Sequence, residues 1–173
     1  KQVLAQIVEN HRIAETEHIA LCQDTGMAVI FAEVGREVCI QGDFERAVNN
    51  GVRKAYQEGY LRKSVVHDPL YKRQNTTDNT PAIIHTRLTE GDTLTLTAMP
   101  KGFGSENMSR IAMLAPAKGE KGVIDFVVQC VKDAMANPCP PVVVGVGIGG
   151  DFEYAALLSK KALARSIQTH HPD

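Results

Sequence analysis

The sequence predicts an α+β fold, a single domain in which helices pack over a mixed sheet that contains an antiparallel hairpin. The segments 82–88 and 93–99 alternate apolar and polar residues around Thr-Glu-Gly-Asp at 89–92, which is typical of a hairpin. Continuous apolar runs at 27–34 and 142–146 are typical of buried strands. Apolar residues at helical spacing elsewhere predict the covering helices.

The helices are predicted from apolar periodicity and from the residues at their ends. The segment 2–16 has its apolar residues at helical spacing. Asp43 is a suitable N-cap for a helix over 44–58, and Gly59 is a suitable end. Three more helices are expected over 105–114, 123–136 and 151–165. A short strand at 38–40 completes the predicted elements.

Composition limits the kinds of partner. The 173-residue chain has a formal net charge of −1 and no basic block, which argues against nucleic acid. No stretch approaches the roughly 20 apolar residues of a membrane span, and no signal peptide is visible, so we expect no membrane partner and a cytoplasmic location. The chain begins without Met, and we expect residues 1–173 to be one domain truncated at both ends.

The cysteines fall into two groups. Cys39 and Cys130 lie in apolar stretches, and we expect both to pack in the core. Cys22 opens the sequence Cys-Gln-Asp-Thr-Gly before one apolar run, and Cys139 lies in Asn-Pro-Cys-Pro-Pro before another. Reactive groups at the mouth of a buried strand are typical of a functional site. Two distant thiols in a chain without a secretory signal favour a shared metal or cluster site over a disulfide.

A polar segment over 62–81 is long for a connection inside a compact domain. It is rich in basic residues, hydroxyls and amides, which suit a small carboxylate ligand. A solvated loop is the alternative interpretation of the same composition.

Two further motifs leave other classes open. The glycines at 145–150 fit G-x-G-x-x-G, the turn of a dinucleotide-binding oxidoreductase domain. Such a domain also needs an acid further along the chain to bind the ribose, and Asp173 is the one acid near that distance from the turn. Zinc is disfavoured because no C-x₂₋₄-C pair exists and His170 and His171 are terminal. A non-catalytic interaction module, with thiols that only pack, is the third alternative.

Four motifs occur in the order in which one known family carries them. They are Cys-Gln-Asp-Thr-Gly at 22–26, Asn-Thr-Thr-Asp-Asn-Thr-Pro-Ala at 75–82, the glycine-rich loop 101–107, and the segment 139–150. On these motifs the chain resembles the class I iron–sulfur fumarate hydratases and L-tartrate dehydratases over nearly its whole length. The resemblance is to the alpha subunit of the two-subunit type, or to the N-terminal domain of the fused type.

The resemblance implies a hydro-lyase that hydrates fumarate reversibly to L-malate, with a 4Fe-4S cluster as Lewis acid. Cys22 and Cys139 match two of the three cluster ligands, and the third ligand lies beyond this chain. Because two thiolates do not complete such a site, we expect this chain alone to hold the cluster incompletely. Four positions match substrate-contacting residues: Gln23, Asp24, Arg62 and Gly102, with Gly104 as the alternative to Gly102.

The resemblance also implies partners. The catalytic base and further carboxylate-binding residues belong to a beta subunit or C-terminal domain, so this chain is expected to be inactive alone and to work in an oligomer. Fumarate is favoured over tartrate because 75–82 and 101–107 are more similar to the fumarase branch. An L-tartrate dehydratase alpha subunit is the alternative. Phe103 departs from the glycine that some members carry, which affects the geometry expected for its loop.

Overall fold

The structure is a computed structural model that describes residues 1–169. His170, His171 and Asp173, considered above for zinc and ribose binding, lie outside the described residues. Residue contacts divide the chain into two compact units. The first unit holds Lys1–Ala28 and Cys39–Ile83, and the second holds Val29–Val38 and the residues from Ile84 onward.

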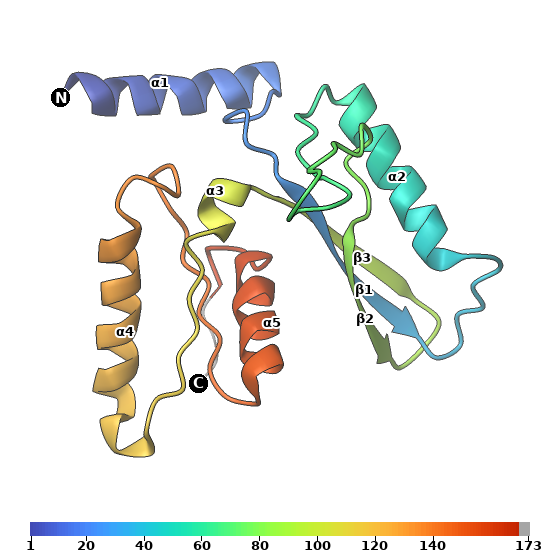
Figure 1. Cartoon of the computed structure of the whole chain (residues 1–173). Coiled ribbons are helices and arrows are strands. Elements are labelled where there is room, and N and C mark those ends of the chain that lie inside the picture. Colours follow the sequence, from blue (N-terminus) through green and yellow to red (C-terminus); the bar gives the residue numbers. More distant parts are fainter. Residues whose placement is uncertain (170–173) are drawn as a thin grey trace. The chain divides into compact units, whose positions relative to one another are not determined.

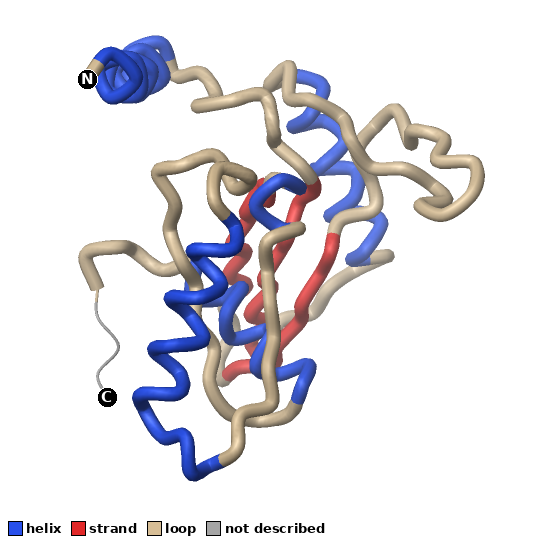
Figure 2. The backbone as a smooth tube through the Cα atoms, turned by 60° about the vertical axis from the view of Figure 1, so that its left-hand side comes forward, coloured by secondary structure: helices blue, strands red, loops and turns tan. Residues whose placement is uncertain are grey.

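Helices and strands follow one another along the chain as drawn in Figures 1 and 2. They are α1 (Gln2–Glu17), β1 (Met27–Gly35), α2 (Phe44–Glu58), β2 (Ile83–Thr89), β3 (Leu94–Lys101), α3 (Phe103–Glu106), the short 3₁₀ helix η1 (Pro116–Lys118), α4 (Gly119–Ala134) and α5 (Phe152–Leu163). The combination of helices with a three-stranded mixed sheet confirms the predicted α+β class. None of the described helices is long and apolar enough to cross a membrane.

The sheet has the strand order β2-β1-β3, so the first strand of the chain lies in its centre. Just past the end of β1, the Arg36 N–H donates to the Thr89 carbonyl, and the Gly35 N–H donates to the Thr93 carbonyl, both at 2.9 Å. The end of β1 therefore lies beside the end of β2 and the start of β3. This makes β1 parallel to β2 and antiparallel to β3.

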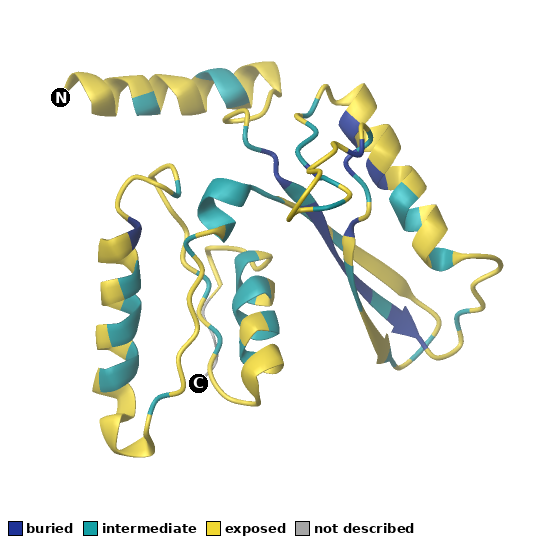
Figure 3. Cartoon of the chain, viewed as in Figure 1, coloured by how far each residue is buried: buried dark blue, intermediate teal, exposed yellow. Residues whose placement is uncertain are grey.

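The two strands predicted as a hairpin are antiparallel, but each pairs with β1 and not with the other. The three strands differ in hydrophobicity, and this difference explains why they pair otherwise than expected. β1 is apolar on both faces, and most of its residues are buried, whereas β2 and β3 are half-buried or exposed along their length (Figure 3). A strand that is apolar on both faces gains most from the central position, and strands with one polar face suit the edges.

Local signals placed the helices well. α1 and α4 confirm the helices predicted near the start of the chain and over 123–136, and α2 has the predicted bounds. The Asp43 carboxylate accepts a hydrogen bond from the Arg46 N–H at 2.8 Å, as an N-cap should. Asp151 caps α5 in the same way, because its carboxylate accepts from the Tyr154 N–H at 2.8 Å.

Three predicted elements are wrong. Residues 142–146 form no strand and lie in a loop (tan in Figure 2), and Val143 is 66% exposed. The segment 38–40 follows a turn in which the Val38 N–H bonds back to the Gly35 carbonyl, and it forms no strand. The helix expected over 105–114 is only the four-residue α3, because Ser105 donates to the Gly102 carbonyl within this turn and caps no longer helix.

One side chain joins three loop segments of the first unit. Asn79 is 0% exposed. Its Oδ1 accepts from the backbone N–H groups of Ser64, at 2.7 Å, and Val65, at 3.0 Å. Its Nδ2 donates to the Gly26 carbonyl at 2.8 Å. The backbone of Asn79 has φ 61°, a left-handed conformation that asparagine tolerates better than most residues.

We predict that Asn79→Leu destabilises the protein by about 3 kcal/mol or more, because it leaves one half-buried and one buried N–H donor and one buried carbonyl without partners. Urea unfolding at neutral pH measures the change. The matched control is Asn50→Leu, since Asn50 bonds only Arg53 among the described residues, on the exposed face of α2. It should change stability by about 0.5 kcal/mol or less. Equal losses in the two variants would contradict the bridging role of Asn79.

Candidate functional site

The first unit places the motif 22–26 beside the start of the polar segment 62–81. The Thr25 hydroxyl donates to the Arg62 carbonyl at 2.9 Å. The Tyr56 hydroxyl donates to the Thr25 carbonyl at 2.9 Å, and burial raises the pKa of Tyr56, so the phenol keeps its proton. The backbone of Arg62 is thus fixed against the loop that carries the thiol.

The residues predicted to bind substrate in this unit are consequently neighbours. Cys22 and Gln23 are exposed at the start of the motif, Asp24 is half-buried, and the Arg62 side chain is exposed. A thiol, an amide, a carboxylate and a guanidinium are therefore carried by two loops that the Thr25–Arg62 hydrogen bond joins. A guanidinium binds a small carboxylate bidentately, so this set suits a dicarboxylate ligand.

The polar segment 62–81 is an ordered loop, in which side chains form hydrogen bonds to the backbone. Asp78 accepts from the Arg53 guanidinium at 2.8 Å, and from the Thr80 N–H and hydroxyl at 3.0 and 2.7 Å. Burial raises the pKa of Asp78, but these hydrogen bonds outweigh burial and hold it at about 2. The carboxylate is therefore ionised at neutral pH and is engaged in holding the loop. This order argues against a freely solvated loop.

Buried polar side chains in the described residues support the same conclusion. They are Thr25, Thr76 and Asn79, and all three belong to the two motif loops. The Thr76 hydroxyl has no hydrogen-bond partner among the described residues. Polar groups concentrate in the interior where these loops meet, which a connection serving only as a link does not require.

In the second unit, Gly102 lies at the start of α3, where an ion cluster surrounds it. Lys101 Nζ donates to the Ser105 hydroxyl at 2.6 Å and lies 3.4 Å from the Glu106 carboxylate. Lys160 of α5 bonds the same carboxylate. Burial raises the pKa of Glu106, but the two ammonium groups, Lys160 foremost, outweigh burial and lower it. Nothing in the sequence indicated Lys160, because a lysine inside a helix gives no local signal of an ion pair with a distant loop.

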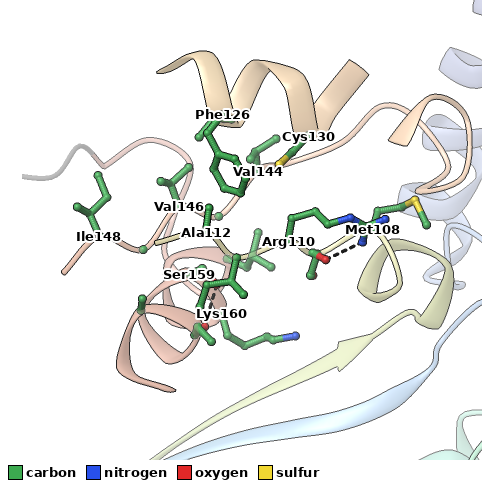
Figure 4. A pocket seen from close by; sticks show the side chains of 18 of the residues that line it. Met108, Arg110, Ala112, Phe126, Cys130, Val144, Val146, Ile148, Ser159 and Lys160 are labelled. Atoms are coloured by element: carbon green, nitrogen blue, oxygen red, sulfur yellow. Dashed lines mark hydrogen bonds between the residues drawn. The ribbon is translucent and has the colours of Figure 1, made fainter. Parts of the chain in front are cut away.

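Cys139 is exposed in a loop of the second unit. Its φ is 58°, and its N–H donates to the Ala136 carbonyl at 3.1 Å. The segment that follows it borders an apolar cleft of about 940 Å³. Phe126, Cys130, Val144 and Val146 line this cleft from facing sides, as Figure 4 shows.

The remaining cysteines differ from expectation in part. Cys130 is half-buried and lines the cleft, whereas Cys39 is exposed and does not pack in a core. Cys39 is exposed because the chain leaves the sheet at the turn after β1. All four cysteines carry free thiols.

The glycines at 145 and 147 have a packing role. A Cβ on Gly145 would lie 2.2 Å from the Ser159 carbonyl oxygen, and a Cβ on Gly147 would lie 2.2 Å from the Ala155 carbonyl oxygen. Only glycine lets the backbone pass this close to α5. Since no strand precedes the turn, this segment also lacks the strand that a dinucleotide-binding turn requires.

The thiols of Cys22 and Cys139 belong to different units. Both are exposed and carried by loops, which suits ligands of an inorganic cluster. Among residues 1–169, no three His, Cys, Asp or Glu side chains are grouped so that they could hold a metal ion. Thiols are the donor type that an iron–sulfur cluster takes, and neither described unit brings these two thiols together.

An α+β chain with an exposed thiol on the loop before its central strand, and an arginine held beside that loop, belongs to the class of proteins that carry candidate functional groups on ordered loops. Comparison with known protein families shows the family to which the chain belongs. The model of the family described as Fumarate hydratase (Fumerase) matches residues 1–173, so the chain belongs to that family.

Individual relatives agree with the family. A protein of Methanocaldococcus jannaschii, provisionally named L(+)-tartrate dehydratase subunit alpha, is 40% identical over 179 residues, covering 100% of this chain and 62% of that protein. The L(+)-tartrate dehydratase subunit alpha of Escherichia coli is 33% identical over 154 residues, covering 88% of this chain and 51% of that protein. The chain thus spans between about half and two thirds of the length of these relatives.

We predict that Gly145→Ala destabilises the protein by about 2 kcal/mol or more, because the added methyl group would overlap the α5 backbone. Gly51→Ala is the matched control. Gly51 lies in α2, and a Cβ there would meet nothing within 4 Å, so this variant should gain about 0.5–1 kcal/mol. Thermal unfolding of both variants measures the difference. A neutral Gly145→Ala would contradict the packing role.

Proposed function

We propose that this chain is the substrate-binding and cluster-binding part of a hydro-lyase that adds water reversibly to fumarate to give L-malate. One observation carries the proposal, namely that Thr25 and Asn79 hold the motif 22–26 directly against the segment of Arg62. Membership of the fumarate hydratase family supports the reaction class. The names of the relatives, as subunits of a dehydratase, support the same class.

The chain's own residues bind and orient the substrate in this proposal. The Arg62 guanidinium holds one substrate carboxylate through two parallel hydrogen bonds, which fixes the plane of that group. The Gln23 amide and the Gly102 N–H donate to other substrate oxygens, and Asp24 accepts from a substrate hydroxyl. Holding both ends of a four-carbon diacid in one orientation presents the same face of its double bond to water.

A 4Fe-4S cluster, when bound, supplies a Lewis acid at its open iron, and Cys22 and Cys139 are the residues of this chain that would ligate it. The third thiolate and the catalytic base come from outside residues 1–173, from further chain or from a beta subunit. The names of the relatives, each given as one subunit of a dehydratase, support a further subunit.

L(+)-tartrate is the second candidate substrate. The specific observation in its favour is that both relatives described above are named for its dehydration. Tartrate and malate are both four-carbon diacids, so Arg62 would bind either through a carboxylate. Discrimination between them depends on groups that meet the second hydroxyl.

We predict that the protein, reconstituted anaerobically with iron and sulfide together with its beta subunit or C-terminal domain, binds iron and consumes fumarate. Loss of fumarate absorbance measures the rate, and L(+)-tartrate is assayed in parallel. Arg62→Met should lower kcat/KM about 100-fold, mainly by raising KM, because a bidentate carboxylate contact is lost.

Arg36→Met is the matched control, because Arg36 pairs only with Glu90 at an exposed site among the described residues, and it should leave the kinetics unchanged. A colourless protein without iron would contradict the proposal and favour the interaction module. A marked rise in melting temperature with NAD would favour the oxidoreductase alternative.

A further inference from the structure

α5 contacts two functional segments of the second unit through consecutive residues. The Ser159 carbonyl lies against Gly145, in the segment that follows Cys139. The next residue, Lys160, bonds the Glu106 carboxylate at the end of α3. Figure 4 shows Ser159 and Lys160 on this helix, with Val144 and Val146 on the neighbouring segment.

The loop that carries Gly102 is also closed on itself. Lys101 Nζ donates to the Ser105 hydroxyl at 2.6 Å, and that hydroxyl donates to the Gly102 carbonyl at 3.1 Å. Glu106 then lies between two ammonium groups, 3.4 Å from Lys101 Nζ and in contact with Lys160. The loop is therefore closed by its own hydrogen bonds, and Glu106 links it to α5.

Burial separates this link from an ordinary surface ion pair. The side chains of Lys101 and Lys160 are 12% and 19% exposed, and that of Glu106 is 37% exposed. By contrast, the neighbouring Lys161 pairs with Glu33 at 3.1 Å where both side chains are 45% and 39% exposed. The two carboxylates are similarly exposed, but Lys160 is more buried than Lys161, so water screens the Lys160 pair less.

We propose that Lys160 is a positioning residue, which through Glu106 fixes the loop 101–107 relative to the segment after Cys139 and so holds the Gly102 N–H in its place for substrate. The role of Gly102 in this statement rests on the proposed function. The attachment of the loop to α5 does not rest on the proposed function, and it can be measured without any assay of activity.

The experiment compares Lys160→Met with Lys161→Met in the full-length protein assembled with its partner. Lys160→Met should speed backbone hydrogen exchange in residues 102–107 about tenfold and raise the KM for fumarate about tenfold, with kcat within twofold. Lys160→Arg, which keeps the charge, should restore both. Lys161→Met should change neither, because it breaks only the exposed pair with Glu33.

Glu106→Gln is the second variant, for use if Lys160→Met does not fold, and it should loosen the same residues. Unchanged exchange in 102–107 in either variant would overturn the proposal, and so would equal loosening in Lys161→Met. Faster exchange without a rise in KM would overturn the link to Gly102. If the wild-type protein hydrates no fumarate and dehydrates no tartrate, the proposed function fails, while the exchange data still decide the role of Lys160.

Discussion

The side-chain amide of Asn79 is the constraint on which the first unit depends. It satisfies two backbone donors at the start of the polar segment and one carbonyl at the end of the motif 22–26. An amide suits this place because it accepts at one end and donates at the other, which no apolar or purely acidic side chain does. Thr25 and Tyr56 extend the same network to the backbone of Arg62. Burial of these polar groups is costly unless every partner is in place, so the network specifies a single arrangement of the loops.

A second set of contacts performs a comparable task in the other unit. Glycines at 145 and 147 let the segment after Cys139 lie directly on α5, and Lys160 connects that helix to the loop of Gly102. Each unit therefore fixes its predicted functional loops through side chains that do not themselves carry the chemistry. The loops predicted to be functional thus have backbones that are held in place, as a rigid scaffold holds its loops.

The sequence predicted the features that depend on residues close together along the chain. The cap Asp43 and the apolar run of β1 were sufficient to place α2 and the central strand. Pairing was not predicted, because whether β2 pairs with β3 or with β1 depends on which strand gains most from burial in the centre. The strand expected over 142–146 does not form, for a related reason. Gly145 and Gly147 let this segment pack against α5, a helix that comes later in the sequence. The motif 75–82 included Asn79 but gave no sign that its side chain bridges other loops, and nothing local distinguished Lys160 from a surface residue.

Backbone hydrogen exchange at Ser64 and Val65 tests the central claim most directly, because both amides donate to Asn79 Oδ1 and belong to no helix or strand. If the network holds the site loops as described, these two amides exchange as slowly as those in the centre of β1. Exchange at the rate of an unprotected surface loop would contradict the account.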